Sequence, residues 1–387
     1  MKLTDVCDFQ GGSQPPKNQW SDEPKEGYIR MLQIRDFTQD NSKVEYVKIT
    51  NSTKKCEEKD ILIARYGASI GKILTGLSGA YNVAMMKVII DENIVDRKFI
   101  YNFLKSDVFQ NHIKNVGQRA AQAGFNKGEL SKININLPTL KEQKNVGKEL
   151  DKVQEIIDIR EKQIEQLDEL IKSQFVEMFG DPVLNPMKWK VKKLRELSSK
   201  VMSGNTPKGG DRVYVSSGIE FYRSQNVWKN KIEKDDIAYI DEETHRKMAK
   251  SSLKHNDLLI TKTGRINTEN SSLGRTALYT GEDDKANING HVYLVRLNKE
   301  ENHEFILRIL ISDAYREHIR SVCVGGIDKR QLNKEHIESF PIIYPPIELQ
   351  NQFAEFVKLI DKQKFEMQSS LEETQKLQES LMNKYFG

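Results

Sequence analysis

The feature that most constrains the fold of this 387-residue chain is that its sequence repeats. Residues 138–180 align without a gap on residues 345–387, and proline, glutamine, serine, phenylalanine and glycine recur at matching positions. Upstream, and with small gaps, Asp60-Ile61-Leu62-Ile63 matches Asp257-Leu258-Leu259-Ile260. Self-similarity over this length indicates a tandem duplication of one structural unit.

Each copy consists of a long segment of mixed composition followed by a shorter helical segment. Among the weaker matches, we expect Arg30 to correspond to Arg223. Two prolines, Pro182 and Pro186, mark a linker after the first helical segment. The predicted boundaries are a first globular domain at 1–137, a helical spacer at 138–180, a second globular domain at 181–345 and a second helical spacer at 346–387.

The helical segments carry apolar residues at heptad spacing, which predicts two long helices that pair along one seam. Polar residues interrupt each seam, so neither helix is strongly apolar alone, and mutual pairing is the simplest arrangement. The alternative is that each helix packs on its own globular neighbour. The positions assigned to the seam are Leu150, Val153, Ile157, Ile164, Leu167, Ile171 and Met178 in the first helix, and Val357, Ile360, Met367, Leu371 and Leu381 in the second.

The globular segments combine short apolar runs, typical of strands, with stretches of helical period. Strands are predicted at 60–65, 84–90, 257–260 and 291–297, and helices at 99–116 and 304–322. The fold class is therefore α+β: two mixed domains in tandem, each followed by a long helix.

Charge and composition favour a globular intracellular protein. The net charge is +4, with a basic excess in the globular segments and an acidic excess in the helical ones. A basic excess suits phosphate-bearing partners, although an ordinary solvated surface explains an excess of this size equally well. The three cysteines are far apart in sequence and cannot form a disulfide framework, which is typical of a reducing compartment. We see no secretory signal and no apolar run that could span a membrane.

Motifs for catalysis and metal binding are incomplete. The loop 67–73 has glycines and Lys72 but lacks Walker spacing, so it serves to aim amides and a cation at an anion, or simply as a turn. Tyr344-Pro345-Pro346 lacks the flanking residues of an amino-methyltransferase box. The histidines are scattered, and we expect no metal site. No catalytic set stands out.

Polar residues of the glycine-containing loops are the remaining candidates for function. Arginine, lysine, asparagine and glutamine read base edges, and the two cations also bind phosphate. Each one alone is more often an ordinary surface residue, but they gather in loops of both copies. The candidate DNA-binding residues are Arg30, Gln33, Arg35, Arg65, Tyr66, Lys72, Arg119 and Lys127 in the first copy, and Arg223, Gln225, Asn226, Lys262, Arg265, Asn267, Arg275, Lys329 and Arg330 in the second.

In this arrangement the chain resembles the specificity subunit of type I restriction–modification enzymes over its whole length. The resemblance rests on the duplication, on the two Asp-Ile/Leu-Leu-Ile runs with their glycine loops, on residues 137–143 with their echo at 344–350, and on Phe179-Gly180-Asp181-Pro182 at the junction. One departure is Leu349, which stands where the first copy has Glu142; it leaves the architecture untouched.

The resemblance implies two target-recognition domains, each reading half of a bipartite double-stranded DNA site, and two helices paired antiparallel as a coiled coil between them. It implies that two adenine-methyltransferase subunits and translocase–nuclease restriction subunits supply the chemistry, in the cytoplasm of a bacterium or archaeon. S-adenosylmethionine and ATP with Mg²⁺ are then expected only in those partners, and this chain is not an enzyme.

Three other interpretations stay open. The chain could serve a methylation-only or related system built on the same repeat. It could be a methyltransferase or nuclease that acts alone, against which the missing catalytic motifs argue. It could also be a coiled-coil interaction protein without a DNA role, which would leave the two basic, loop-rich domains unexplained.

Overall fold

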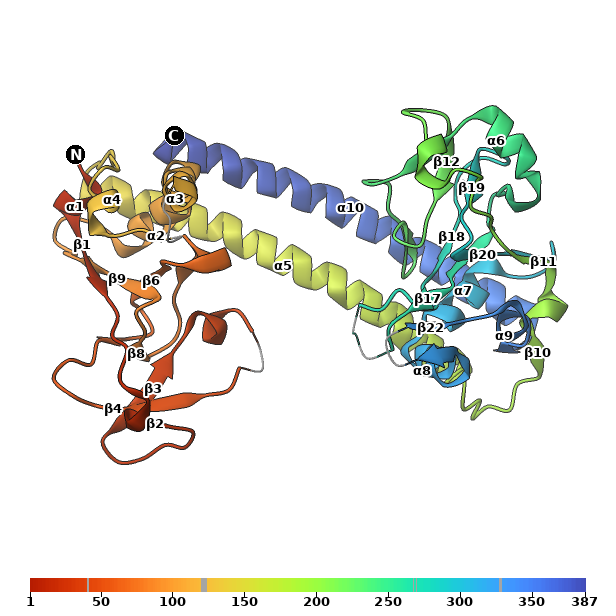
Figure 1. The fold of residues 1–387 in the computed structure, drawn as a ribbon, viewed down its shortest axis with the longest axis horizontal. Helices are drawn as coiled ribbons and strands as arrows, with labels where there is room; N and C mark the ends of the chain where they lie inside the picture. Colours follow the sequence, from red (N-terminus) through yellow and green to blue (C-terminus); the bar gives the residue numbers. More distant parts are fainter. Residues whose placement is uncertain (40–41, 120–123, 267, 269, 327–328) are drawn as a thin grey trace. The chain divides into compact units, whose positions relative to one another are not determined.

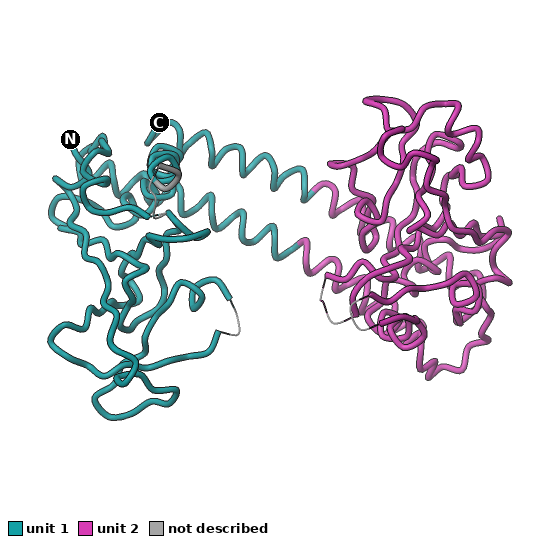
Figure 2. Tube along the Cα trace, viewed as in Figure 1, with its two compact units in different colours: residues 1–163, 367–387 teal, residues 164–366 magenta. Residues whose placement is uncertain are grey.

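The structure is a computed structural model that describes residues 1–39, 42–119, 124–266, 268, 270–326 and 329–387. The chain forms two compact units (Figure 2). Unit 1 comprises residues 1–163 and 367–387, and unit 2 comprises residues 164–366. Two 40-residue helices, α5 (Leu140–Phe179) and α10 (Ile347–Phe386), contribute to both units. The boundaries of the four sequence segments stay a prediction, because the units divide both helices.

Unit 1 is built on two sheets with helices beside one of them (Figure 1). The first sheet is antiparallel, with the order β1 (Cys7–Gly11), β9 (Met85–Ile90), β6 (Ile61–Ala64) and β7 (Ile73–Leu74). The second has the order β2 (Trp20–Ser21), β4 (Glu45–Lys48), β3 (Tyr28–Leu32), β8 (Gly79–Tyr81) and β5 (Lys55–Cys56). The helices are α1 (Leu3–Val6), α2 (Arg97–Lys105), α3 (Asp107–Arg119) and α4 (Lys127–Leu130).

Unit 2 has the same central sheet with additions. Its antiparallel sheet has the order β11 (Ser198–Ser203), β20 (Val292–Leu297), β16 (Leu258–Thr261) and β18 (Thr276–Leu278). A second sheet has the order β15 (Ala238–Ile240), β12 (Ile219–Tyr222) and β19 (Ala286–Ile288). The smaller sheets are β10 (Val191–Lys193) with β23 (Pro341–Ile343), β13 (Val227–Trp228) with β14 (Lys231–Ile232), and β17 (Thr263–Gly264), β22 (Lys329–Gln331) and β21 (Val324–Gly326). The helices are α6 (Glu242–Lys247), α7 (His303–Ile311), α8 (Asp313–Val322) and α9 (Lys334–Glu338).

The matching strand orders confirm the duplication that the sequence predicts. In both units the second sheet contains one parallel pair, β3 with β8 and β12 with β19, among antiparallel neighbours. The predicted strands are present, although all four, β6, β9, β16 and β20, begin one residue later than predicted.

The two stretches predicted as single helices are each broken into two, at Ser106 and at Ser312. Both serines have extended backbone angles, which end one helix and start the next. The Ser312 side chain caps the second helix by accepting a hydrogen bond from the Tyr315 N–H. The apolar period continues across the break, so periodicity alone hides it.

Helices α5 and α10 lie against each other in both units, and their order is antiparallel. In unit 1, Tyr385 Oη donates to Glu149 Oε2 (2.6 Å), and Gln378 Nε2 donates to Gln154 Oε1 (2.9 Å). In unit 2, Phe353 packs on Phe175, with ring centroids 5.4 Å apart. Partner numbers fall along α10 as they rise along α5, which confirms the predicted pairing of the helices.

Most of the predicted seam is buried. Leu150, Val153, Ile157, Ile171, Val357, Ile360 and Leu371 are buried, and Ile164, Leu167, Met178, Met367 and Leu381 are half-buried. The alternative packing also occurs, at the helix ends. The end of α5 joins the core of unit 2, where Phe179 packs on Phe305, and the end of α10 joins the core of unit 1, where Phe386 packs on Phe99. Each helix therefore enters the core of the domain from the other copy.

No helix in the described part of the chain combines the length and the apolar character that crossing a bilayer requires.

Candidate nucleic-acid interface

In unit 1, loops from four strands meet at one edge. Because β3 and β8 are parallel, their carboxyl ends lie together, and Asn82 N donates to Leu32 O (3.3 Å). Gly12 N donates to Met85 O (3.1 Å), and Arg65 N to Ala84 O (2.8 Å). We call the residues that follow these strands, 12–13, 33–37, 65–72 and 82–84, the loop edge of unit 1.

Unit 2 builds an equivalent loop edge with the same backbone bonds. Asn289 N donates to Tyr222 O (3.0 Å), Gly204 N to Val292 O (2.9 Å) and Lys262 N to His291 O (2.8 Å). Its residues are 204–206, 223–226, 262–266, 270–274 and 289–291, with Lys262 in the place of Arg65. The shared bonds align Leu32 with Tyr222, so Arg223 corresponds to Gln33.

The expected match between Arg30 and Arg223 is therefore wrong. The sequences of the two copies must be shifted here to bring Leu32 opposite Tyr222. Direct matching of the two arginines hides this shift. Arg30 lies within β3, and its Nη2 pairs with Asp36 Oδ1 at 3.3 Å, whereas Arg223 lies after the end of its strand.

Two glycines allow the loops to close, and sequence reasoning missed them. A Cβ on Gly12 would lie 2.0 Å from Asn82 O, and a Cβ on Gly204 would lie 2.1 Å from Ile288 O. Only glycine permits such an approach of two backbones. Asn82 and Asn289 were missed as well; each accepts a hydrogen bond from the N–H two residues ahead and shapes its turn. A glycine recurring at the end of the first strand of each copy was the available signal.

In unit 1, one carboxylate oxygen holds two candidate residues. Gln33 Nε2 and Arg35 Nη2 both donate to Glu45 Oε2, at 2.7 and 2.5 Å. Glu45 lies at the start of β4, opposite Met31. The structure therefore brings the glutamine and the arginine together in one oriented pair.

In unit 2, an aspartate plays the same part. Arg223 Nη2 pairs with Asp236 Oδ2 at 3.1 Å and donates to the Asp236 carbonyl at 2.6 Å, and Gln225 Nε2 donates to Asp236 Oδ2 at 2.9 Å. The pKa of Asp236 is lowered, mainly by the hydrogen bond from Gln225 and then by the contact with Arg223 and its charge. Asn226 is buried, and its amide holds the Arg223, Glu233 and Asp236 backbone. These contacts stabilise the loop, and the DNA contact predicted for Asn226 stays a prediction.

Arg65 and Tyr66 occupy the centre of the unit 1 loop edge. Arg65 Nε donates to Phe125 O (3.2 Å), and the guanidinium lies 5.1 Å from the Tyr66 ring centroid. Tyr66 is 40% exposed and forms a β-bridge with Gly124. Lys127 is exposed and forms an ion pair with Asp8 at the start of β1.

In unit 2, several candidate cations surround the loop that follows Lys262. Arg265 and Lys329 line a pocket of about 360 Å³ together with Asn270 and threonine and serine side chains. The Lys262 Nζ lies 5.9 Å from the Tyr293 ring centroid, and Arg330 Nη1 donates to Cys323 O (3.3 Å). Strand pairing of β17 with β22 places Gly264 opposite Arg330, which brings these segments together.

Arg275 shapes this loop from within. Its Nε and Nη2 donate to Ser271 O (3.0 Å) and Asn270 O (2.5 Å), and its guanidinium stacks 3.8 Å from the Trp228 ring centroid. Burial lowers the pKa of Arg275. The side chain is thus engaged in holding the loop.

Two cations on the loop edges, Lys72 and Arg265, and a third beside the edge of unit 2, Lys329, are not engaged in this way. Lys72, Arg265 and Lys329 are exposed, and their side chains have no hydrogen-bond or ion-pair partner among the residues that the structure describes. Such cations are free to meet phosphate. Two further candidates, Asn267 and the side chain of Arg119, lie outside the part of the chain that the structure describes.

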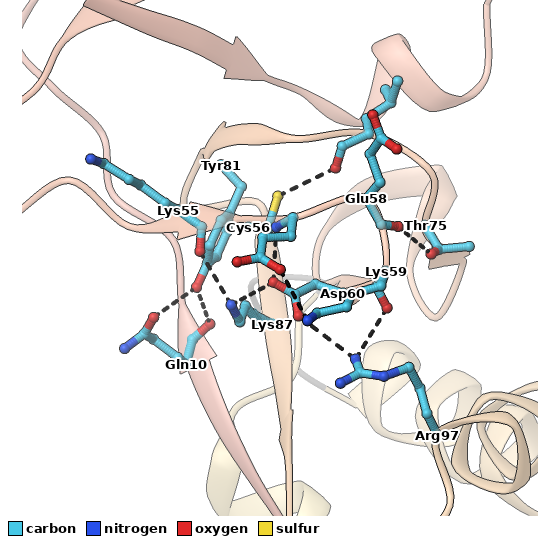
Figure 3. A network of polar contacts seen from close by, with 12 residues as sticks. Gln10, Lys55, Cys56, Glu58, Lys59, Asp60, Thr75, Tyr81, Lys87 and Arg97 are labelled. Atoms are coloured by element: carbon cyan, nitrogen blue, oxygen red, sulfur yellow. Dashed lines mark hydrogen bonds and ion pairs between the residues drawn. The ribbon is translucent and has the colours of Figure 1, made fainter. Parts of the chain in front are cut away.

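The repeated aspartates, Asp60 and Asp257, lie away from the loop edges, at the start of β6 and β16. Asp60 pairs with Lys87 (2.6 Å) and Arg97 (3.7 Å), as Figure 3 shows. Burial would raise the pKa of Asp60, but hydrogen bonds from Lys87 and the Glu57 N–H and the nearby positive charges outweigh it, and the pKa is lowered. The repeated motif is therefore structural.

No group of three or more histidine, cysteine or acidic side chains suited to a metal ion occurs in the described ranges. Cys7, Cys56 and Cys323 are buried free thiols.

Comparison with known proteins supports this architecture. A family model, described as the type I restriction modification DNA specificity domain, matches residues 1–169 and 186–378. The MjaVIII specificity subunit of a type I restriction enzyme from Methanocaldococcus jannaschii is 24% identical over 375 residues, which cover 94% of this chain and 86% of that protein. The EcoKI specificity subunit from Escherichia coli K12 is 22% identical over 356 residues, covering 86% and 74%.

Solved structures have the same fold. A chain from a type I restriction–modification system, solved in work on complex assembly and conformational transition, superposes with a TM-score of 0.59 at 16% identity, covering 100% of this chain and 96% of that chain. The S subunit of a type I system from M. genitalium gives 0.55 at 17% identity, covering 100% and 95%. The chain belongs to the family of type I restriction–modification DNA specificity domains.

Proposed function

We propose that this chain acts as the DNA-recognition specificity subunit of a type I restriction–modification complex. The observation that carries the proposal is the loop edge, which both units build with the same backbone hydrogen bonds and line with cations and amides. Two copies of one reading surface suit a target with two half-sites, one for each unit. Base contacts would supply sequence preference, and Lys72, Arg265 and Lys329, which are exposed, would contact phosphate.

The chain works with DNA and with modification and restriction subunits. We infer that two adenine-methyltransferase subunits and translocase–nuclease subunits join it, and that S-adenosylmethionine and ATP with Mg²⁺ bind to those partners. The sequence supports this division, because it contains neither a Walker phosphate loop nor an amino-methyltransferase box. We expect the complex to act in the cytoplasm of a bacterium or archaeon, where its DNA target is found.

Reconstitution with the methyltransferase subunit tests the proposal. The purified chain, the methyltransferase subunit and both together are incubated with S-adenosylmethionine and genomic DNA, and methylated adenines are mapped by sequencing. We expect methylation only in the mixture, at one bipartite motif. Sequence-specific methylation or cleavage by the chain alone would contradict the proposal, and so would methylation by the mixture at scattered sites.

The same experiment separates the alternatives. A methylation-only system gives the same motif but no ATP-dependent cleavage when any further subunits encoded beside the gene are added. A coiled-coil interaction protein without a DNA role leaves the specificity of the methyltransferase unchanged.

A further inference from the structure

The two loop edges share one arrangement of side chains that goes beyond general DNA binding. In each unit, a glutamine and an arginine occupy the first and third positions after the end of the strand, and one carboxylate oxygen accepts a hydrogen bond from the glutamine and forms an ion pair with the arginine. The order is reversed between the units: Gln33 then Arg35 in unit 1, and Arg223 then Gln225 in unit 2. The backbone bonds that align Leu32 with Tyr222 make these positions equivalent.

The carboxylate fixes the direction of both side chains while leaving most of their polar groups available. Each glutamine uses one N–H on the acid and keeps its carbonyl oxygen, and each arginine keeps further N–H donors. Holding long polar side chains in place before binding lowers the entropy lost on contact.

Charge distinguishes this pair from the other cations of the edge. Glu45 and Asp236 offset the positive charge of Arg35 and Arg223, and a carboxylate beside a guanidinium disfavours an approaching phosphate. A base edge, which is neutral and carries donors and acceptors, suits the pair better. Arginine makes two hydrogen bonds to guanine, and glutamine makes two to adenine.

We propose that Gln33 with Arg35, and Arg223 with Gln225, are the specificity-determining residues of the two units: in each, the arginine selects guanine and the glutamine selects adenine at neighbouring positions. The reversed order gives the two units opposite base order at these positions. This inference rests on the proposed function, since it names the readers within the proposed DNA-binding edge.

Exchange of the two residues within one unit is the sharpest test. The double variant Gln33→Arg with Arg35→Gln keeps composition and charge. It is assembled as the full chain with its methyltransferase subunit, and the methylated motif is read from a randomised DNA library. We expect the guanine and adenine preferences to exchange positions in one half-site, with the other half-site unchanged. The matching variant Arg223→Gln with Gln225→Arg should alter the other half-site only.

Two further variants separate reading from support. Glu45→Gln should keep the preferred bases but reduce discrimination at both positions, by about 5- to 150-fold, the range for a bidentate base contact. The matched control Glu129→Lys with Lys132→Glu exchanges a surface ion pair between α4 and the residues just after it, and should leave the motif intact. Folding and assembly of each variant are checked by circular dichroism and size-exclusion chromatography.

An exchanged variant that assembles and methylates the original motif overturns the inference, as does an assembled variant that loses methylation without a new preference. If the exchange in one unit prevents folding, the inference is tested by the exchange in the other unit and by Glu45→Gln. The proposed function fails separately, when the unaltered chain directs no motif at all.

Discussion

Asp257 and Arg296 form a two-bonded ion pair inside unit 2, with Arg296 Nε and Nη2 donating to the two carboxylate oxygens at 2.8 and 2.6 Å. The Asp257 side chain is 1% exposed. It also accepts the Lys254 N–H at 2.7 Å. The pair ties the start of β16 to β20, and an unpaired charge at this place would be unfavourable.

We therefore expect Arg296→Met to destabilise unit 2 by about 3 kcal/mol or more, because it leaves a buried carboxylate without its partner. The control is Lys247→Met, which breaks the exposed Lys247–Glu243 pair and should leave the unfolding free energy nearly unchanged. Urea unfolding of the full chain, followed by circular dichroism, measures both. Equal changes in unfolding free energy for the two variants would show that the buried Asp257–Arg296 pair stabilises the unit no more than an exposed pair does.

The lowered pKa of Asp60 predicts acid sensitivity of unit 1. A folded pKa below the unfolded value contributes stability that is present above about pH 3.9 and is lost as pH falls through the folded pKa. Unfolding free energy measured from about pH 6 to pH 2 should fall less steeply for Asp60→Asn than for the unaltered chain. Lys87→Met should destabilise the unit at neutral pH, because burial then opposes the charged carboxylate. An unchanged acid slope in Asp60→Asn would refute this account.

The pairing of α5 with α10 is tested by two leucines of α10 in unit 1. Leu371 is 5% exposed, and Leu377 is 51% exposed. Leu371→Ala should cost about 2–4 kcal/mol through lost burial and a cavity, whereas Leu377→Ala should change stability by less than about 0.5 kcal/mol. The helix propensity change is the same for both, so the difference in unfolding free energy isolates the packing. Similar values for the two would contradict the buried seam.

The exposed cations Arg265 and Lys329 of unit 2 should act through phosphate. Arg265→Ala and Lys329→Ala should each weaken DNA binding by the assembled complex for all sequences alike, and each should reduce the slope of log K against log salt by about 0.9. Lys247→Ala is the control. Lys247 lies in α6, which follows β15, and β15 ends beside the start of β12, whereas the loop edge lies at the other end of β12. Fluorescence anisotropy over a salt series measures the slope. A change in base preference in either variant would instead indicate base reading.

Sequence periodicity predicted much of the fold because its signals are local. Heptads mark the buried faces of α5 and α10, and the repeated Asp60 and Asp257 mark β6 and β16. The break at Ser312 was not predicted, because the apolar period continues across it and conceals the new helix that Ser312 caps.

The loop edges were predicted only in part, because their geometry depends on residues distant in sequence. Gln33 and Arg35 were candidates, but Glu45, which orients them, lies ten or more residues away on another strand. Arg275 was an equally good candidate by composition, yet tertiary packing on Trp228 turns it into a loop support. Residue type suggests what a side chain can contact, and packing decides what it does contact.

The helix ends determine how the two recognition surfaces can be exchanged. Replacing residues 190–345 with those of another family member should change one half-site only, provided the core of unit 2 survives. In that core, Phe179 of α5 packs on Phe305, which the exchange would replace, and also on Phe353 of α10. We therefore expect an exchange of 164–366, which carries both helix ends with it, to fold more stably than an exchange of 190–345. Melting temperatures compare the two chimaeras, and mapping of methylated adenines compares their motifs; a change in both half-sites by either chimaera would contradict the assignment of one half-site to each unit.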